Sequence, residues 1–149
     1  MPAKSTKTQN EVARFKEALE ARNYKFTRPR RIIAEKVLSM RKHFTAEGLY
    51  NSLRKSKSIS RATVYRTLAL LAQLGFVEVH DFGKGRRFYE YVGGKKSHSH
   101  FICIKCGKII EFPSDKIESI IQEAAAANSF MIKRFSINVY GLCGKCAQK

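Results

Sequence analysis

Acidic residues are scarce in this chain of 149 residues, which has 12 Asp and Glu against 29 Lys and Arg. The formal net charge is +17, and such an excess on a chain of this size favours a polyanionic partner, most often nucleic acid. The excess is uneven, because residues 1–94 carry 20 basic against 8 acidic residues and residues 95–149 carry 9 against 4. We therefore expect nucleic acid to bind the first part of the chain.

Long apolar runs are also missing, and none approaches the roughly 18 residues of a membrane-spanning helix. No segment combines a basic face with a broad Leu/Phe face that is not needed for the hydrophobic core, so we expect no membrane partner. We see no secretory signal peptide, and we therefore expect a cytoplasmic, reducing environment. The hydrophobic content of 44% suffices for one ordinary domain or two small ones.

Cysteine occurs only in two matched pairs, Cys103-x-x-Cys106 and Cys143-x-x-Cys146. A tight turn at this spacing aims two thiolates at one ion, so the sequence predicts a closed tetrahedral Zn²⁺ site with four sulfur ligands. The alternatives are two disulfides or four buried free thiols, and a reducing compartment disfavours the disulfides. A site of this kind stabilises a fold and leaves no open position for catalysis.

Helical periodicity and N-cap residues predict four helices before residue 75. The first covers residues 11–22 and follows a mobile basic tail, residues 1–10, while the other three begin after the N-caps Thr27, Thr45 and Ser60. The last two span 46–55 and 61–74, and Gly75 ends the fourth. Strands at 76–80 and 87–91 flank a glycine-containing turn at 82–85. This order predicts a winged helix-turn-helix over residues 1–92.

A second domain is predicted over residues 98–149, after a hinge at 93–97 that is rich in glycine, lysine and serine. We expect strands at 99–104, 109–112 and 131–140, and a helix at 115–128 with Ser114 as its N-cap. The predicted class is α+β, an N-terminal winged helix-turn-helix followed by a C-terminal α/β domain that holds the four-cysteine zinc site.

The helix predicted at 61–74 is the candidate DNA-reading element. Val64, Leu68 and Leu71 recur at helical spacing and should face the core, which turns the small or basic residues between them outward, toward a major groove. An ordinary solvated basic helix face is the alternative. We expect contacts to phosphates or base edges from this helix and from the wing, through Arg61, Ala62, Thr63, Tyr65, Arg66, Lys84, Arg86 and Arg87.

A second group of metal-ligand residues surrounds the first cysteine pair. His98 and His100 are two residues apart on a predicted strand, so their imidazoles point to the same side. A hairpin closed by the first cysteine pair would bring Glu111 near them. Two solvated surface histidines are the alternative, and the spacing alone leaves both open.

Several of these stretches resemble the ferric uptake regulator family. They are Ala-Thr-Val-Tyr-Arg-Thr-Leu at 62–68, His-Asp-Phe-Gly at 80–83, the segment from His98 to Phe112, and Tyr-Gly-Leu-Cys-Gly-Lys-Cys at 140–146. The match spans roughly residues 11–146 in the family's order. It implies a bacterial, metal-sensing transcription regulator rather than an enzyme, with a C-terminal dimerisation domain and a homodimer on a palindromic A/T-rich DNA operator.

The resemblance also implies particular site residues. Lys25 matches a position from which the family reaches a minor groove. The regulatory metal would take its ligands from both halves of the chain, namely His43, Glu90, His98, His100 and Glu111.

Three imidazoles and two carboxylates suit a borderline ion such as Fe²⁺ or Mn²⁺, and no thiolate remains for it. Two departures from the family bear on the metal. An accessory third site would need ligands where this chain has Phe135 and Ser99, and Glu118 alone holds no ion, so we predict no third site. Peroxide-sensing members prefer Asp where this chain has Glu111, and zinc-sensing members tend to recruit an extra thiolate. The sequence therefore favours an iron- or manganese-responsive repressor over a peroxide- or zinc-responsive regulator.

Two further functions stay open at this point. A zinc-dependent hydrolase could use the His/Glu cluster, but the chain has no HExxH helix and its charge suits a DNA backbone better than a small substrate. A regulator with structural zinc only would bind DNA constitutively. Metal-dependent DNA affinity separates these possibilities.

Overall fold

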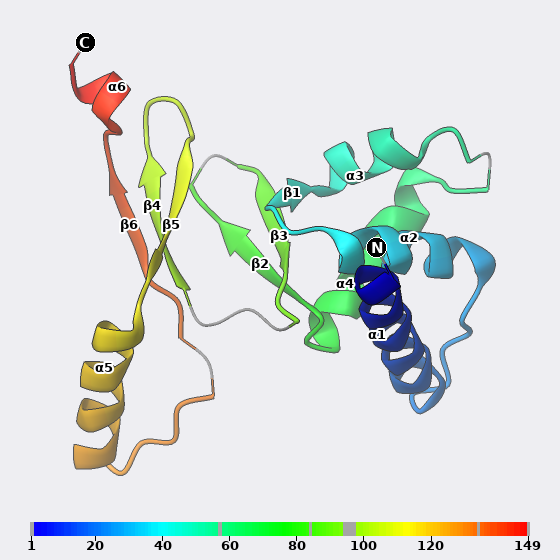
Figure 1. Cartoon of the computed structure of the whole chain (residues 1–149), viewed down its shortest axis with the longest axis horizontal. Coiled ribbons are helices and arrows are strands. Elements are labelled where there is room, and N and C mark those ends of the chain that lie inside the picture. The colour runs from blue at the N-terminus through cyan, green and yellow to red at the C-terminus, as the bar shows by residue number, and fades with distance from the viewer. Residues whose placement is uncertain (1, 57, 84, 94–97, 134, 149) are drawn as a thin grey trace. The chain divides into compact units, whose positions relative to one another are not determined.

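The computed structural model describes residues 2–56, 58–83, 85–93, 98–133 and 135–148, and for residues 2–5 it describes the backbone alone. The chain divides into two compact units, Met1–Gly94 (unit 1) and Lys95–Lys149 (unit 2). Residues 94–97 of the predicted hinge lie outside the described residues. The predicted α+β class is confirmed, since both units combine helices with a three-stranded sheet (Figure 1).

Unit 1 consists of four helices and a small sheet. Its elements, in chain order, are α1 (Pro2–Glu20), α2 (Arg28–Ser39), β1 (Phe44–Thr45), α3 (Ala46–Leu53), α4 (Arg61–Gln73), β2 (Val77–Asp81) and β3 (Arg87–Tyr91). The predicted N-caps of α2, α3 and α4 are confirmed. The side-chain oxygens of Thr27, Thr45 and Ser60 each accept a hydrogen bond from the backbone N–H three residues on, at 3.5, 3.0 and 3.2 Å.

The helices of unit 1 enclose its hydrophobic core. Val64, Leu68 and Leu71 of α4 are fully buried, which confirms the predicted inward face of that helix. They lie in one cluster with residues from α1, α2 and α3, among them Phe15, Leu19, Ile33, Val37 and Leu49. One side of α4 therefore packs in the core, and the opposite side of this helix lies at the surface.

The sheet of unit 1 has the strand order β1-β3-β2, and all its pairs are antiparallel. Strands β2 and β3 form the predicted wing hairpin, and Gly83 and Gly85 in its turn have φ of 75° and 64°, in the left-handed region that favours glycine. Strand β1 was not predicted, because two residues are too short for an alternating pattern. It pairs Phe44 with Tyr89 and adds the segment that precedes α3 to the sheet.

Unit 2 contains β4 (His98–Cys103), β5 (Ile109–Pro113), α5 (Asp115–Ala127), β6 (Asn138–Gly141) and α6 (Gly144–Ala147). Its strand order is β5-β4-β6. Strands β4 and β5 form an antiparallel hairpin, whereas β6 runs parallel to β4 on its other side. The connection that contains α5 therefore carries the chain from one edge of the sheet to the other (Figure 1). Strands β4 and β6 therefore end side by side.

Two sequence predictions about elements are wrong, and a third is confirmed only in position. The first helix begins at Pro2 rather than at residue 11, because no glycine or proline interrupts residues 3–10 and a helix, once started, extends at little cost. Among the described residues of the strand predicted over 131–140, only the stretch that begins at Asn138 is a strand, Asn138–Gly141, which pairs with β4. Ser114 does occupy the N-cap of α5, but its side chain makes no capping hydrogen bond.

Unit 2 buries little apolar surface. Among its described residues, the buried apolar side chains are those of Ile102, Cys103 and Ala125. Ten of its large hydrophobic side chains are exposed, namely Phe101, Ile104, Ile110, Ile117, Ile120, Phe130, Met131, Val139, Tyr140 and Leu142. An apolar surface of this extent on so small a unit is typical of an interaction face. Within the described part of the chain, no helix is long and apolar enough to cross a membrane.

Candidate metal centres and nucleic-acid interface

The two cysteine pairs meet because of the strand pairing in unit 2. In the parallel pair β4–β6, Cys103 lies opposite Gly141, and the backbone N–H of Ile104 donates to the carbonyl of Gly141 at 2.9 Å. Cys143 follows Gly141 by two residues, and its backbone N–H donates to the Sγ of Cys103 at 3.4 Å. Gly107, with φ of 76°, turns the chain after the first pair.

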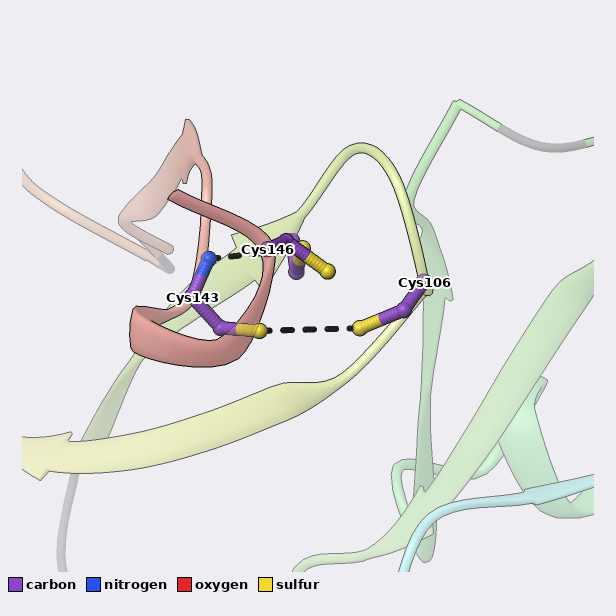
Figure 2. Close-up of side chains that lie close together, drawn as sticks. Cys106, Cys143 and Cys146 are labelled. Carbon is purple, nitrogen blue, oxygen red and sulfur yellow. Dashed lines mark hydrogen bonds between the residues drawn. The ribbon is translucent and has the colours of Figure 1, made fainter. Parts of the chain in front are cut away.

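The four sulfur atoms fit a zinc ion. All four cysteines are free, and their Sγ atoms lie within 4.8 Å of one another. The Sγ atoms of Cys106 and Cys143 are 3.7 Å apart, as the dashed line in Figure 2 marks. A tetrahedron with Zn–S bonds of about 2.3 Å has sulfur–sulfur edges of about 3.8 Å, whereas a disulfide bond measures about 2.0 Å. The arrangement matches a four-cysteine zinc site and differs from a disulfide.

Backbone hydrogen bonds lower the pKa of two of the four thiols. Hydrogen bonds from the backbone N–H groups of Cys106 and Cys143 lower the pKa of Cys103 to about 5. The backbone of Cys146 lowers the pKa of Cys143 in the same way. By contrast, a side-chain hydrogen bond with Cys143 raises the pKa of Cys146 to about 12. Four thiolates cannot coexist at this distance without a cation, so loading the site with zinc releases protons.

Three of the predicted regulatory ligands, His98, His100 and Glu111, lie on the β4–β5 hairpin of unit 2. The antiparallel register places His100 directly opposite Glu111, and His98 points to the same side as His100. One ligand atom from each of these three residues lies within 4.8 Å of the other two. His100 is buried and Glu111 is exposed. The hairpin therefore brings the three residues together, while their binding of an ion remains a prediction.

The other two predicted regulatory ligands, His43 and Glu90, belong to unit 1. The Nε2 atom of His43 lies 3.1 Å from Oε2 of Glu90. His80, which the sequence did not indicate as a ligand, lies close to both. His80 places its Nε2 atom 3.3 Å from the same carboxylate oxygen. Glu90 is 1% exposed and His80 is 5% exposed, so this group is buried.

The register of the wing explains why His80 meets Glu90. His80 pairs with Phe88, and Phe88 and Glu90 are two residues apart on β3, so all three side chains lie on one face of the sheet. A four-residue turn at 82–85 would pair His80 with Arg87, whereas the observed partner of His80 is Phe88, so the predicted turn alone did not reveal that His80 and Glu90 share a face. The position of His43 depends on β1, whose pairing the sequence did not reveal.

The exposed side of α4 is the candidate DNA interface. Ala62, Tyr65, Arg66 and Ala69 are exposed there, as the helical period predicts. A hollow of about 700 Å³ lies between this side of α4, the start of α3 and the wing. Its lining is Thr45, Ala46, Glu47, Gly48, Asn51, Tyr65, Gly85, Arg86, Arg87 and Tyr89.

Two residues at the start of α4 are engaged within unit 1. The guanidinium of Arg61 lies 2.9 Å from Glu47 Oε1 and 5.2 Å from the ring centroid of Tyr50. The hydroxyl of Thr63 lies 2.9 Å from that of the cap residue Ser60. A contact from Arg61 to DNA would replace an exposed ion pair, which costs about 1 kcal/mol or less.

The remaining predicted DNA contacts lie in the wing and before α2. Arg86, Arg87 and Lys25 are exposed. Lys84 lies outside the described residues. The exposed residues are available to a polyanion, and their contacts with DNA remain predictions.

The chain was compared with known proteins. The model of the ferric uptake regulator family matches residues 21–140. The chain belongs to the ferric uptake regulator family. It is 35% identical over 138 residues to the ferric uptake regulation protein of Campylobacter jejuni, a match that covers 91% of this chain and 87% of the relative. This chain is a metal-responsive transcription regulator of that family.

Solved structures agree with this assignment. The ferric uptake regulator of Helicobacter pylori, described as having three functional metal-binding sites, is 26% identical and gives a TM-score of 0.81 with 95% of each chain covered. A zinc uptake regulator complexed with zinc and DNA is also 26% identical, with a TM-score of 0.56 and 95% of each chain covered. The predicted family is thus confirmed, and the similarity extends to regulators named for different metals.

The positions that the family would use for an accessory third site are also described. Phe135 offers no ligand atom, Ser99 is fully buried, and Glu118 is half-buried on α5. The prediction that this chain lacks a third metal site remains a prediction.

Proposed function

We propose that this chain is an iron(II)- or manganese(II)-responsive repressor that works in the cytoplasm and binds a palindromic A/T-rich operator as a homodimer. The proposal rests on the separation of the sulfur ligands from the nitrogen and oxygen ligands. All four thiols of the chain gather in one cluster, so the imidazoles and carboxylates are left for a second ion. A set of nitrogen and oxygen ligands suits Fe²⁺ or Mn²⁺, whereas the sulfur cluster suits structural Zn²⁺.

The proposed regulatory ligands come from both units. Unit 1 offers His43 and Glu90, and unit 2 offers His98, His100 and Glu111. An ion that takes ligands from both units restricts how the winged unit is held against the dimerisation unit. If the restricted form fits the operator better, metal binding shifts the population toward it, in proportion to the difference in metal affinity between the two forms.

The proposed DNA interface is the exposed side of α4 together with the wing. Small residues at positions 62 and 69 leave room for α4 to approach the floor of a major groove, and Arg66 and Tyr65 can meet base edges there. Arg86 and Arg87, which border the hollow beside α4, would neutralise phosphates. The excess of basic residues in unit 1 supports this orientation.

The proposed homodimer forms through unit 2. The exposed apolar side chains of its sheet include Phe101, Ile110, Val139 and Tyr140, which border a second hollow of about 260 Å³ next to the zinc cluster. A second copy of unit 2 would cover this surface. Two winged units on a twofold axis then match a palindromic operator.

A zinc-responsive regulator is the second candidate. The chain is 26% identical both to the H. pylori ferric uptake regulator and to the zinc uptake regulator bound to DNA. Overall similarity therefore does not separate the two metals. The absence of a thiol outside the four-cysteine cluster favours iron or manganese over zinc at the regulatory site.

The proposal is tested by fluorescence anisotropy on zinc-loaded protein and a fluorescent palindromic A/T-rich duplex under anaerobic conditions. Fe²⁺, Mn²⁺ and additional Zn²⁺ are titrated separately, with a scrambled duplex as control. We expect Fe²⁺ or Mn²⁺ to raise the affinity for the palindromic duplex, and we expect little gain on the scrambled duplex. A response to zinc alone would establish the second candidate, and equal affinity with and without metal would refute both.

A further inference from the structure

Unit 1 brings three possible ligand atoms together from its own residues. The Nε2 atoms of His43 and His80 both lie close to Oε2 of Glu90, at 3.1 and 3.3 Å. The three ligand atoms lie within 4.8 Å of one another. All three residues are held by the small sheet, at the end of β2, near the end of β3 and immediately before β1.

The distances match those between ligands of one ion. First-row divalent ions bind imidazole nitrogen and carboxylate oxygen at about 2.1 Å, so two ligands on neighbouring coordination positions lie about 3.0–3.4 Å apart. The two nitrogen–oxygen distances in this group fall in that interval. Two imidazoles and one carboxylate, with further positions open, form a donor set that binds Fe²⁺, Mn²⁺ and similar ions.

The surroundings hold His80 in this orientation. Its ring stacks on Phe82 with centroids 5.3 Å apart and an interplanar angle of 6°, and Phe82 is itself buried. The ring of His43 meets the same phenylalanine edge-on at 6.0 Å. Phe82 thus covers one side of the group and limits the rotation of both imidazoles. A ligand set held in this way needs little reorganisation to accept an ion.

We infer that unit 1 by itself binds one divalent cation through His43, His80 and Glu90, and that His80 is a metal ligand outside the five-residue regulatory set. The inference rests on the proposed function only for the kind of ion. It implies that the regulatory ion can be held by the winged unit before His98, His100 and Glu111 take part. Loading would then occur in two steps, with His43 and Glu90 common to both.

The histidine content of the chain allows a direct test. The chain has four histidines, so the double variant His98→Ala/His100→Ala retains only His43 and His80. Tag-free, zinc-loaded full-length protein is titrated with Mn²⁺, and the loss of the free-ion signal in electron paramagnetic resonance reports binding. Pulsed measurements on the bound Mn²⁺ then count the nitrogen nuclei that are coordinated. Any histidine nitrogen in this variant must come from unit 1.

We expect the double variant to bind one Mn²⁺ per chain, more weakly than the wild type, with nitrogen coupling from two histidines. Adding His80→Gln should leave one coupled nitrogen and weaken binding by about tenfold or more, since even the loss of a residue that only supports a ligand costs about 10–100-fold. Adding Glu35→Gln instead is the matched control, because Glu35 is an exposed carboxylate of unit 1 on α2 that pairs with Arg31 and is not one of the three ligands. This control should bind Mn²⁺ like the double variant.

Absence of Mn²⁺ binding by the folded double variant, or binding without histidine coupling, would overturn the inference and leave a hydrogen-bonded structural cluster. The count of coupled nitrogens in the double variant decides the matter even if the His80→Gln variant does not fold. The wild type, assayed with operator DNA in parallel, tests the proposed function separately. A metal response in the wild type together with no binding in the double variant would refute only the site in unit 1.

Discussion

Replacing Cys106 by serine should remove the zinc ion and with it the folded form of unit 2. Cys106 is exposed and its thiol fills no space in a core, so its substitution leaves no cavity. The change therefore acts through the metal alone. This separates Cys106 from Cys103, which is buried and whose substitution would also disturb packing.

The expected effect is large because unit 2 has little else to stabilise it. Ile102 is the only large aliphatic side chain buried among its described residues, and full burial of such a side chain contributes about 1.5–3 kcal/mol. Structural zinc contributes on the order of 10 kcal/mol in small zinc modules. Loss of the ion should thus exceed what the apolar contacts of unit 2 can offset, and the proposed dimer should dissociate with it.

The assay combines zinc content per chain, thermal unfolding followed by circular dichroism, and analytical ultracentrifugation at low micromolar protein. Lys105→Ser is the matched control, since Lys105 is exposed on the same turn and has no sulfur. The control should keep one zinc ion and the dimer. A Cys106→Ser protein that lacks zinc, yet remains a dimer and unfolds at the wild-type temperature, would show that the cluster does not stabilise unit 2.

Three further predictions concern the DNA interface, the regulatory site and the zinc turn. Arg66→Ala should lower operator affinity by about 1–3 kcal/mol if Arg66 reads a base, and anisotropy should show a smaller loss on a scrambled duplex; equal losses would assign it to a phosphate. His98→Ala or His100→Ala should keep zinc and the dimer but abolish the metal-dependent gain in operator affinity, a coupling of about 1–3 kcal/mol, whereas Phe135→Ala should respond to metal as the wild type does. A full response of both histidine variants would place the regulatory ion elsewhere. Gly107→Ala should cost about 1–2 kcal/mol because φ is 76° there, seen as weaker zinc retention against a chelator; unchanged retention would mean that the turn relaxes.

The sequence was most informative where a signal is local. The N-caps Thr27, Thr45 and Ser60 were predicted correctly, because a cap depends on one side chain and the first turn of its own helix. The inward face of α4 was also predicted correctly, since the spacing of its apolar residues follows the helical period.

The predictions failed where a segment depends on a partner. Residues 131–137 are compatible with a strand by composition, but only Asn138–Gly141 pairs with β4. Strand β1 is defined by its pairing with β3 and has no pattern of its own.

The sequence by itself determined which residues are suited to hold zinc and which side of α4 stays at the surface, because two-residue cysteine spacing and helical period are properties of short segments. The tertiary structure decided which of the distant residues meet. Parallel pairing of β4 with β6 brings Cys103 beside Cys143, forty residues later. The register of the wing and the pairing of β1 bring His80 and His43 to Glu90. Strand pairing is a long-range interaction, and no local pattern in the chain specifies it completely.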